Sequence, residues 1–168
     1  MNVVLIGYRG TGKSHVGYLL SQRLGMKLVS MDAEIVRNAG KSIPQVVEEH
    51  GWSHFRDLET EEARRLADQD GLIIDCGGGV IERTENTAIL KRNAQLFWLK
   101  ASVPTIVSRI EHDTQRPALT SGKSFTEEVA EVLERRTPLY QNAADCTIDT
   151  DTRTPQQVAD AIVAHLGF

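Results

Sequence analysis

The strongest chemical signal in the sequence is the segment at residues 7–14, which reads Gly-Tyr-Arg-Gly-Thr-Gly-Lys-Ser. It matches the GxxxxGK[ST] pattern of a P-loop, in which glycines let backbone N–H groups turn toward phosphate oxygens at a helix N-terminus. Lys13 can bridge the β- and γ-phosphates of a nucleotide, and Ser14 offers a hydroxyl to Mg²⁺. A chance match in a chain of this length is roughly half a percent at ordinary residue usage. The segment predicts nucleotide binding, although GTPases, ATPases and kinases all share it.

Three consecutive glycines at residues 77–79 form a second candidate site. They follow a short apolar run that ends in Asp75. Glycine lets the backbone approach a ligand without a Cβ in the way, and ligands of open α/β sheets bind at the carboxyl ends of strands. The position therefore favours a ligand-binding turn, with a plain tight turn as the alternative.

The elements that must position these residues follow an alternation of short apolar runs and amphipathic stretches, which predicts a parallel sheet built from βαβ units. Strands are expected at residues 3–6, 27–29, 72–74, 95–99 and 147–148. Helices are expected at residues 16–24, 52–67 and 103–110. Capping-box patterns mark three further helix starts, at Ser42, Ser124 and Thr154. The expected fold is a three-layer α/β P-loop fold with a five-stranded parallel sheet.

The segment at residues 111–123 is polar, contains Pro117 and Gly122, and lacks apolar periodicity. Loops of this length in compact domains are often functional, and an active-site lid is one common use. An idle surface loop is the alternative.

Size and composition limit the class of protein. The chain has 168 residues, of which 40% are apolar and 25% charged, so one compact domain is expected. A net charge of −4 without a basic run argues against nucleic acid as a partner. Cys76 and Cys146 form no C-x-x-C pair, which suits a reducing cytoplasm. The five histidines show no HExxH spacing, and the pair His50 and His54 lacks a third ligand. No signal peptide or membrane-spanning stretch is expected.

Several further motifs, taken with the P-loop, resemble those of the shikimate kinase family in order along nearly the whole chain. They are Asp32 after the second strand, Phe55-Arg56 with Glu59, the glycines at residues 77–79, Arg116-Pro117, and the run Arg-Thr-Pro-Leu-Tyr at residues 136–140. The resemblance implies a fold like that of nucleoside monophosphate kinases. It also implies transfer of the γ-phosphoryl group of MgATP to the 3-hydroxyl of shikimate, a step of aromatic amino acid and chorismate biosynthesis. The expected single kinase domain spans residues 1–168, with an acceptor-binding helical region at residues 32–60 and a lid at residues 111–124.

The resemblance also implies roles for individual residues. The expected catalytic residues are Lys13, Asp32 and Arg116. The expected nucleotide-binding residues are Gly10, Thr11, Gly12, Lys13, Ser14, His15, Arg109, Arg116 and Pro155. The expected acceptor-binding residues are Asp32, Arg56, Gly77, Gly78, Gly79 and Arg136, and the metal ligand is Ser14.

Structural interpretations stand beside the functional ones. Asp32 follows a strand and precedes a helical pattern, so it could be a helix N-cap. Arg56 could simply pair with Glu59 on a solvated helix face. Arg109 could be a surface residue, and Pro155 also suits the first position of a capped helix.

The chain departs from the family pattern near the expected metal. Ser30 stands two positions before Asp32, where the resemblance implies another Asp that helps to position Mg²⁺ through water. Asp75 is a candidate for the missing carboxylate, in the manner of a Walker B Asp.

Two further departures from the family pattern lie elsewhere in the chain. Arg135 stands where an acidic residue is common in the family, and Ala118 follows Pro117 where a leucine is more usual.

Two other functions stay open at this stage. Another small-metabolite P-loop kinase, such as a gluconate kinase, would share the P-loop but need different acceptor contacts. A nucleotide-binding regulatory domain that has lost its chemistry is the alternative from another class. For the leading interpretation the expected partners are shikimate and ATP or ADP, with no nucleic acid and no membrane. A monomer is expected.

Overall fold

The computed structural model describes residues 1–110 and 124–168. In chain order the elements are β1 (Asn2–Ile6), α1 (Lys13–Leu24), β2 (Lys27–Ser30), α2 (Met31–Ala39), α3 (Ile43–Ala67), β3 (Leu72–Asp75), the 3-10 helix η1 (Val80–Glu82), α4 (Thr84–Lys91), β4 (Ala94–Lys100), α5 (Val103–Ile110), α6 (Phe125–Ala143), β5 (Cys146–Asp149) and α7 (Pro155–Leu166). Each of the five predicted strands is present and extends one residue beyond its predicted range at one or both ends.

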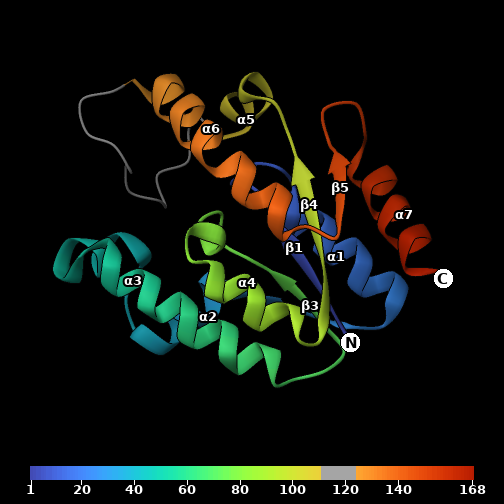
Figure 1. The fold of residues 1–168 in the computed structure, drawn as a ribbon, viewed down its shortest axis with the longest axis horizontal. Coiled ribbons are helices and arrows are strands. Elements are labelled where there is room, and N and C mark those ends of the chain that lie inside the picture. The colour runs from blue at the N-terminus through green and yellow to red at the C-terminus, as the bar shows by residue number, and fades with distance from the viewer. Residues whose placement is uncertain (111–123) are drawn as a thin grey trace.

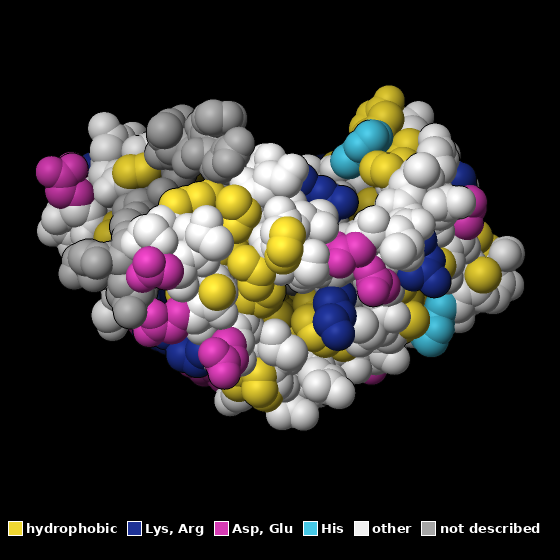
Figure 2. All heavy atoms as spheres, turned by 90° about the horizontal axis from the view of Figure 1, so that it is seen from above, with side chains coloured by type: hydrophobic (Ala, Val, Ile, Leu, Met, Phe, Trp, Pro, Cys, Tyr) yellow, Lys and Arg dark blue, Asp and Glu magenta, His cyan; other side chains and the backbone are white. Residues whose placement is uncertain are grey.

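The five strands form one parallel sheet in the order β2-β3-β1-β4-β5, which confirms the predicted α/β fold (Figure 1). Because the strands are parallel, their carboxyl ends meet at one edge of the sheet. At that edge Asp75 of β3 is in register with Ser30 of β2 on one side and with Leu5 of β1 on the other. Figure 2 looks onto the side of the molecule toward which β4 and β5 point, and acidic and basic side chains are interspersed there.

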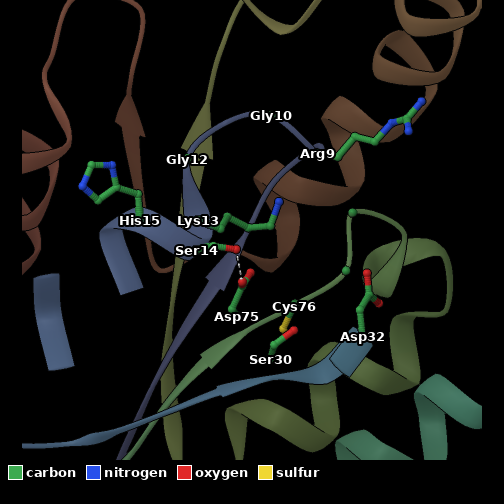
Figure 3. A pocket seen from close by; sticks show the side chains of 12 residues that line it. Arg9, Gly10, Gly12, Lys13, Ser14, His15, Ser30, Asp32, Asp75 and Cys76 are labelled. Atoms are coloured by element: carbon green, nitrogen blue, oxygen red, sulfur yellow. Dashed lines mark hydrogen bonds between the residues drawn. The ribbon is translucent and has the colours of Figure 1, made fainter. Parts of the chain in front are cut away.

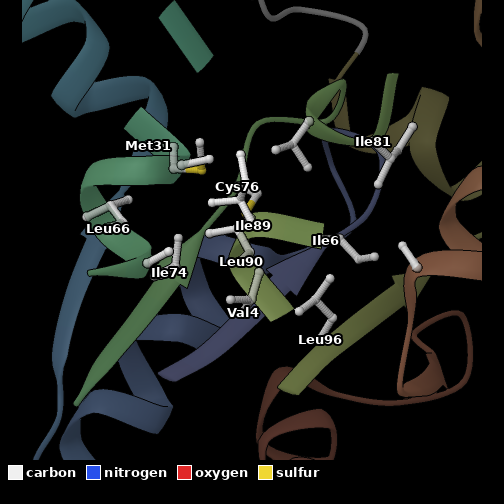
Figure 4. Close-up of a cluster of buried hydrophobic side chains, with 14 of the residues drawn as sticks. Val4, Ile6, Met31, Leu66, Ile74, Cys76, Ile81, Ile89, Leu90 and Leu96 are labelled. Atoms are coloured by element: carbon white, nitrogen blue, oxygen red, sulfur yellow. The ribbon is translucent and has the colours of Figure 1, made fainter. Parts of the chain in front are cut away.

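Two buried clusters place helices on both faces of the sheet. Successive strand residues point to opposite faces, so Val4 and Ile74 belong to one cluster while Leu5 and Ile73 belong to the other. Helices α3, α4 and α6 cover the first face (Figure 4), and α1 and α7 cover the second. The fold therefore has the three layers that the sequence predicts.

Helix ends follow the local sequence signals. Ser42 and Thr154 form complete capping boxes, as predicted. Ser124 accepts a hydrogen bond from the backbone N–H of Glu127, which is one half of the predicted box. Gly51, at φ 85°, breaks the regular geometry of α3, so the apolar periodicity that begins after it belongs to the second part of this helix. Helix α6 continues through Pro138.

Within residues 1–110 and 124–168, no helix combines the length and the apolar character that crossing a membrane requires.

Candidate active site

The P-loop connects the central strand β1 to α1, with glycine in left-handed backbone geometry at Gly10 (φ 82°) and Gly12 (φ 92°). A residue with a Cβ is strained at such angles, so these positions favour glycine. The Lys13 ammonium donates hydrogen bonds to the carbonyl oxygens of Gly7, at 2.8 Å, and Tyr8, at 2.9 Å. The loop thus holds a buried cation beside the N-terminus of α1, an arrangement suited to phosphate oxygens.

Ser14 and Asp75 meet where the P-loop faces the end of β3 (Figure 3). The Ser14 hydroxyl donates a hydrogen bond to Asp75 Oδ2 at 2.6 Å. Burial raises the pKa of the Asp75 carboxyl, while the Lys13 charge and the Ser14 hydrogen bond act in the opposite direction. A hydroxyl and a carboxylate from separate segments therefore share one corner of the site.

A cavity of about 410 Å³ lies in front of this pair. It brings together most of the residues predicted for catalysis and phosphate binding, and part of the glycine turn. The predicted residues that line it are Gly10, Gly12, Lys13, Ser14, His15, Asp32, Gly77 and Gly78. No role was predicted for Arg9 and Cys76, which line it too, although Arg9 lies within the P-loop motif and Cys76 directly precedes the glycine turn.

The interpretation of Asp32 as a helix N-cap is wrong. Helix α2 is capped by Ser30, whose hydroxyl accepts a hydrogen bond from the backbone N–H of Ala33 at 3.2 Å. Asp32 follows this cap residue by two positions and lies inside the first turn of α2. Its side chain is therefore not needed as the cap, and Asp32 lines the cavity that contains Lys13.

The glycine turn lies directly against two guanidinium groups. A Cβ on Gly79 would come within 2.4 Å of both terminal nitrogens of Arg56, and one on Gly78 within 3.4 Å of Arg136 Nη1. A side chain at Gly79 would displace Arg56. The turn thus needs glycine for close approach by arginine, and it brings the two predicted carboxylate-binding arginines to one place.

The predicted pair between Arg56 and Glu59 is present, with Nη1 of Arg56 donating to Glu59 Oε1 at 2.6 Å. It does not lie on a solvated face, because the two side chains are only 11% and 0% exposed. The Arg56 guanidinium also lies 5.1 Å from the ring centre of Trp52 and 5.4 Å from that of Phe55. The cation is therefore held rigidly beside the turn.

Arg136 is held by an acidic residue that the sequence did not indicate. Its Nε donates to Glu82 Oε1 at 3.0 Å, and Glu82 also accepts from Arg135. Burial favours the neutral form of Glu82, but the Arg136 and Arg135 charges outweigh it and lower the pKa of the carboxyl. The Tyr140 hydroxyl donates a hydrogen bond to the carbonyl oxygen of Gly78. Burial raises the pKa of the Tyr140 hydroxyl to about 12. Tyr140 belongs to the 136–140 motif, whereas no sequence signal marks Glu82.

A second cavity, of about 470 Å³, opens on the other side of the P-loop. Arg109 donates to the carbonyl of Gly10 at 3.1 Å. The His15 ring points away from Lys13 and Asp75 in Figure 3. Predicted nucleotide-binding residues line the cavity, namely Gly10, Thr11, Gly12, His15, Arg109 and Pro155. Residues that the prediction missed also line it, namely Val16, Thr150, Arg153 and Val158. The position of Thr150 and Arg153 just beyond β5 is the signal that could have found them.

Arg116 and the predicted lid up to residue 123 lie outside the described residues.

This parallel sheet, with a GxxxxGKS loop at its central strand and an Asp-bearing cavity beside it, defines a P-loop phosphate-binding protein of the small-kinase type. A family model described as "Shikimate kinase" matches residues 9–167. The chain therefore belongs to the shikimate kinase family.

Individual relatives agree with this assignment over nearly full length. A shikimate kinase from Thermodesulfovibrio yellowstonii is 39% identical over 96% of this chain and 92% of its own. One from Caldicellulosiruptor bescii is 34% identical over 98% of this chain and 95% of its own. Among solved structures, a shikimate kinase from Acinetobacter baumannii in complex with shikimate superposes with a TM-score of 0.93 at 31% identity, covering 98% of this chain and 92% of that one.

Proposed function

We propose that this protein transfers the γ-phosphoryl group of ATP to the 3-hydroxyl of shikimate, giving ADP and shikimate 3-phosphate. The observation that carries the proposal is the shared site. Lys13 and Asp32 line one cavity with the glycine turn, and Arg56 and Arg136 lie against that same turn. Membership of the shikimate kinase family and the shikimate-bound Acinetobacter baumannii relative support the choice of acceptor.

The nucleotide binds across the P-loop in this proposal. Backbone N–H groups at the start of α1 and the Lys13 ammonium receive the phosphates. The second cavity, with Arg109 and Pro155 in its lining, receives the adenine and ribose. The two cavities share Gly10, Gly12 and His15, so one molecule can occupy both.

Arg56 and Arg136 grip the acceptor's carboxylate, for which the planar guanidinium fork is well shaped. Asp32 orients the 3-hydroxyl and takes its proton as the oxygen attacks. One bond forms between this oxygen and the γ-phosphorus, while the bond from that phosphorus to the β–γ bridging oxygen breaks and the electron pair leaves with ADP. Arg116 has a charge-stabilising role that rests on the family resemblance alone.

The donor atoms at the P-loop fit Mg²⁺. Ser14 supplies a hydroxyl oxygen beside the Asp75 carboxylate, and hard oxygen donors are what this ion prefers. In the described part of the chain no group of three or more His, Cys, Asp or Glu side chains could hold a metal. Mg²⁺ needs no such group, since it usually takes one or two protein ligands and fills its shell with phosphate and water. When bound, it would neutralise charge on the phosphates.

The proposal includes a cytoplasmic monomer that acts on small molecules. Both cysteines are free thiols, which is the usual state in a reducing compartment.

A coupled assay of ADP release, run on the purified protein with shikimate, with gluconate and without acceptor, tests the function. We expect shikimate to stimulate ADP release and gluconate to leave it at the level without acceptor. Stimulation by gluconate alone would favour the alternative kinase. If neither acceptor stimulates ADP release but the protein binds ADP, the result would favour the regulatory domain.

A further inference from the structure

Asp75 occupies an unusual place for a carboxylate that only completes a strand. It ends β3, is 8% exposed, and lines the cavity that Lys13 and the start of α1 also line. A buried carboxylate beside the phosphates of a nucleotide repels them unless a cation lies between. Lys13 offsets part of this repulsion, and a metal ion that accompanies the nucleotide would offset more of it.

The hydrogen bond to Ser14 supports the same conclusion. The Ser14 hydroxyl donates its only proton to Asp75 Oδ2, so its lone pairs are left to face a metal ion. Groups that orient a metal ligand in this way commonly alter metal affinity by about 10- to 100-fold.

On the neighbouring strand β2, the position level with Asp75 carries no carboxylate. Ser30 is in register with Asp75 across the β2–β3 ladder, and its hydroxyl is committed to capping α2. Ser30 and Asp75 line the same cavity. A carboxylate at residue 30 would thus enter the site from the adjacent strand end.

We propose that Asp75 is the carboxylate of the Mg²⁺ site in this chain, orienting Ser14 and accepting hydrogen bonds from metal-bound water in place of an acidic residue at position 30. Asp75 is a positioning residue, because it acts through Ser14 and water. This inference rests on the proposed function, since it assumes a magnesium nucleotide as the substrate.

The test measures the affinity for ADP by calorimetry with and without Mg²⁺, so that the readout is the ratio of the two dissociation constants and not turnover. Mg²⁺ should tighten ADP binding by a certain factor in the unsubstituted protein, and we expect this factor to be smaller by about 10-fold or more in Asp75→Asn. Metal-free ADP should bind as well as before or better, because a negative charge near the phosphates is removed. Asp70→Asn, an exposed substitution with the same change of charge, should leave the ratio unchanged.

The exchanged variant, Ser30→Asp with Asp75→Ser, provides a rescue test. Asp is also a good N-cap, so α2 is kept while the carboxylate moves to the adjacent strand. We expect this variant to recover most of the Mg²⁺ dependence lost in the Asp75→Ser single variant.

Two outcomes would overturn the inference. One is an unchanged ratio in Asp75→Asn. The other is a loss of Mg²⁺ dependence in Asp75→Ser that the exchanged variant does not recover, because the loss would then reflect the conformation of the P-loop and not a carboxylate beside the metal. Failure of the proposed function would look different, since the unsubstituted protein would show Mg²⁺-dependent ADP binding but no turnover with shikimate.

Discussion

Arg136 and Arg135 are adjacent in sequence but differ in their surroundings. The Arg136 side chain is 4% exposed and lies against the glycine turn, whereas that of Arg135 is 59% exposed. Both arginines contact Glu82. A comparison of substitutions at the two positions therefore distinguishes acceptor binding by Arg136 from the contact with Glu82 that both arginines make.

Arg136→Lys should raise the KM for shikimate by about 10-fold or more, although the charge is kept, because a lysine cannot present two parallel N–H groups to a carboxylate. Steady-state kinetics at saturating ATP measure the change. Arg135→Lys is the matched control and should leave KM within about 2-fold of the unsubstituted value. Equal KM values for the two variants would mean that Arg136 does not hold the carboxylate.

At the scale of elements, the start of α2 is capped by a single serine where β2 joins the helix directly. Ser30 is both the last residue of β2 and the N-cap of α2, so no loop separates strand from helix. Helix α2 carries Asp32, and its start therefore determines where that carboxylate lies.

Ser30→Ala should lower the free energy of unfolding by about 1 kcal/mol, because the Ala33 N–H loses its acceptor. Urea unfolding measures this difference. Ser53→Ala, which replaces an exposed serine inside α3, should have little effect or stabilise slightly. A loss of the same size in both variants would contradict a capping role for Ser30.

The contact between η1 and α6 should depend on pH. The arginines of α6 lower the pKa of Glu82 below its ordinary value of 4.5. A carboxyl with a lowered folded-state pKa stabilises the fold above its unfolded-state pKa, and that contribution is lost as the pH falls through the folded-state value. We expect Glu82→Gln to destabilise the protein at neutral pH, with the difference shrinking as the pH is lowered below 4.5.

Urea unfolding from neutral pH down to about pH 3 tests this. Glu85→Gln, which removes a more exposed carboxylate, is the control for the loss of charge. A difference for Glu82→Gln that stays constant over this range would exclude the ion pair as its cause.

On the scale of the whole molecule, the strand order brings the site together. With β1 between β3 and β4, the P-loop lies beside the end of β3, and β2 places α2 next to both. Ligands that contact several of these segments bind only the folded chain, so they should stabilise the fold as a unit.

ADP with Mg²⁺ at about 100 times its dissociation constant should add about 2.7 kcal/mol to the free energy of unfolding. For a chain of this size that corresponds to a rise in Tm of roughly 5–10 °C. Thermal unfolding followed by circular dichroism measures it. Lys13→Ala should lose most of the shift at the same ADP concentration, and a full shift in that variant would argue against phosphate binding by the P-loop.

Much of the fold could be read from the sequence because its signals are local. The P-loop is contiguous, the buried strands are short apolar runs, and the capping residues stand beside the helices that they start. Helix α4 was not among those predicted, and α2 was expected only as a helical pattern after Asp32, without its cap. The cap of α2 is hidden in the last residue of a strand, and α4 begins without a side-chain cap.

By itself, then, the sequence determined the phosphate-binding loop, the alternation of strands and helices, and the residue types available for chemistry. The tertiary structure decided which of them meet. Ser14 and Asp75 are 61 residues apart and Arg136 and Glu82 are 54 apart, yet both pairs are hydrogen-bonded. Such contacts depend on strand order, on register and on the packing of helices against the sheet, and these are set by burial across the whole chain and not by neighbouring residues.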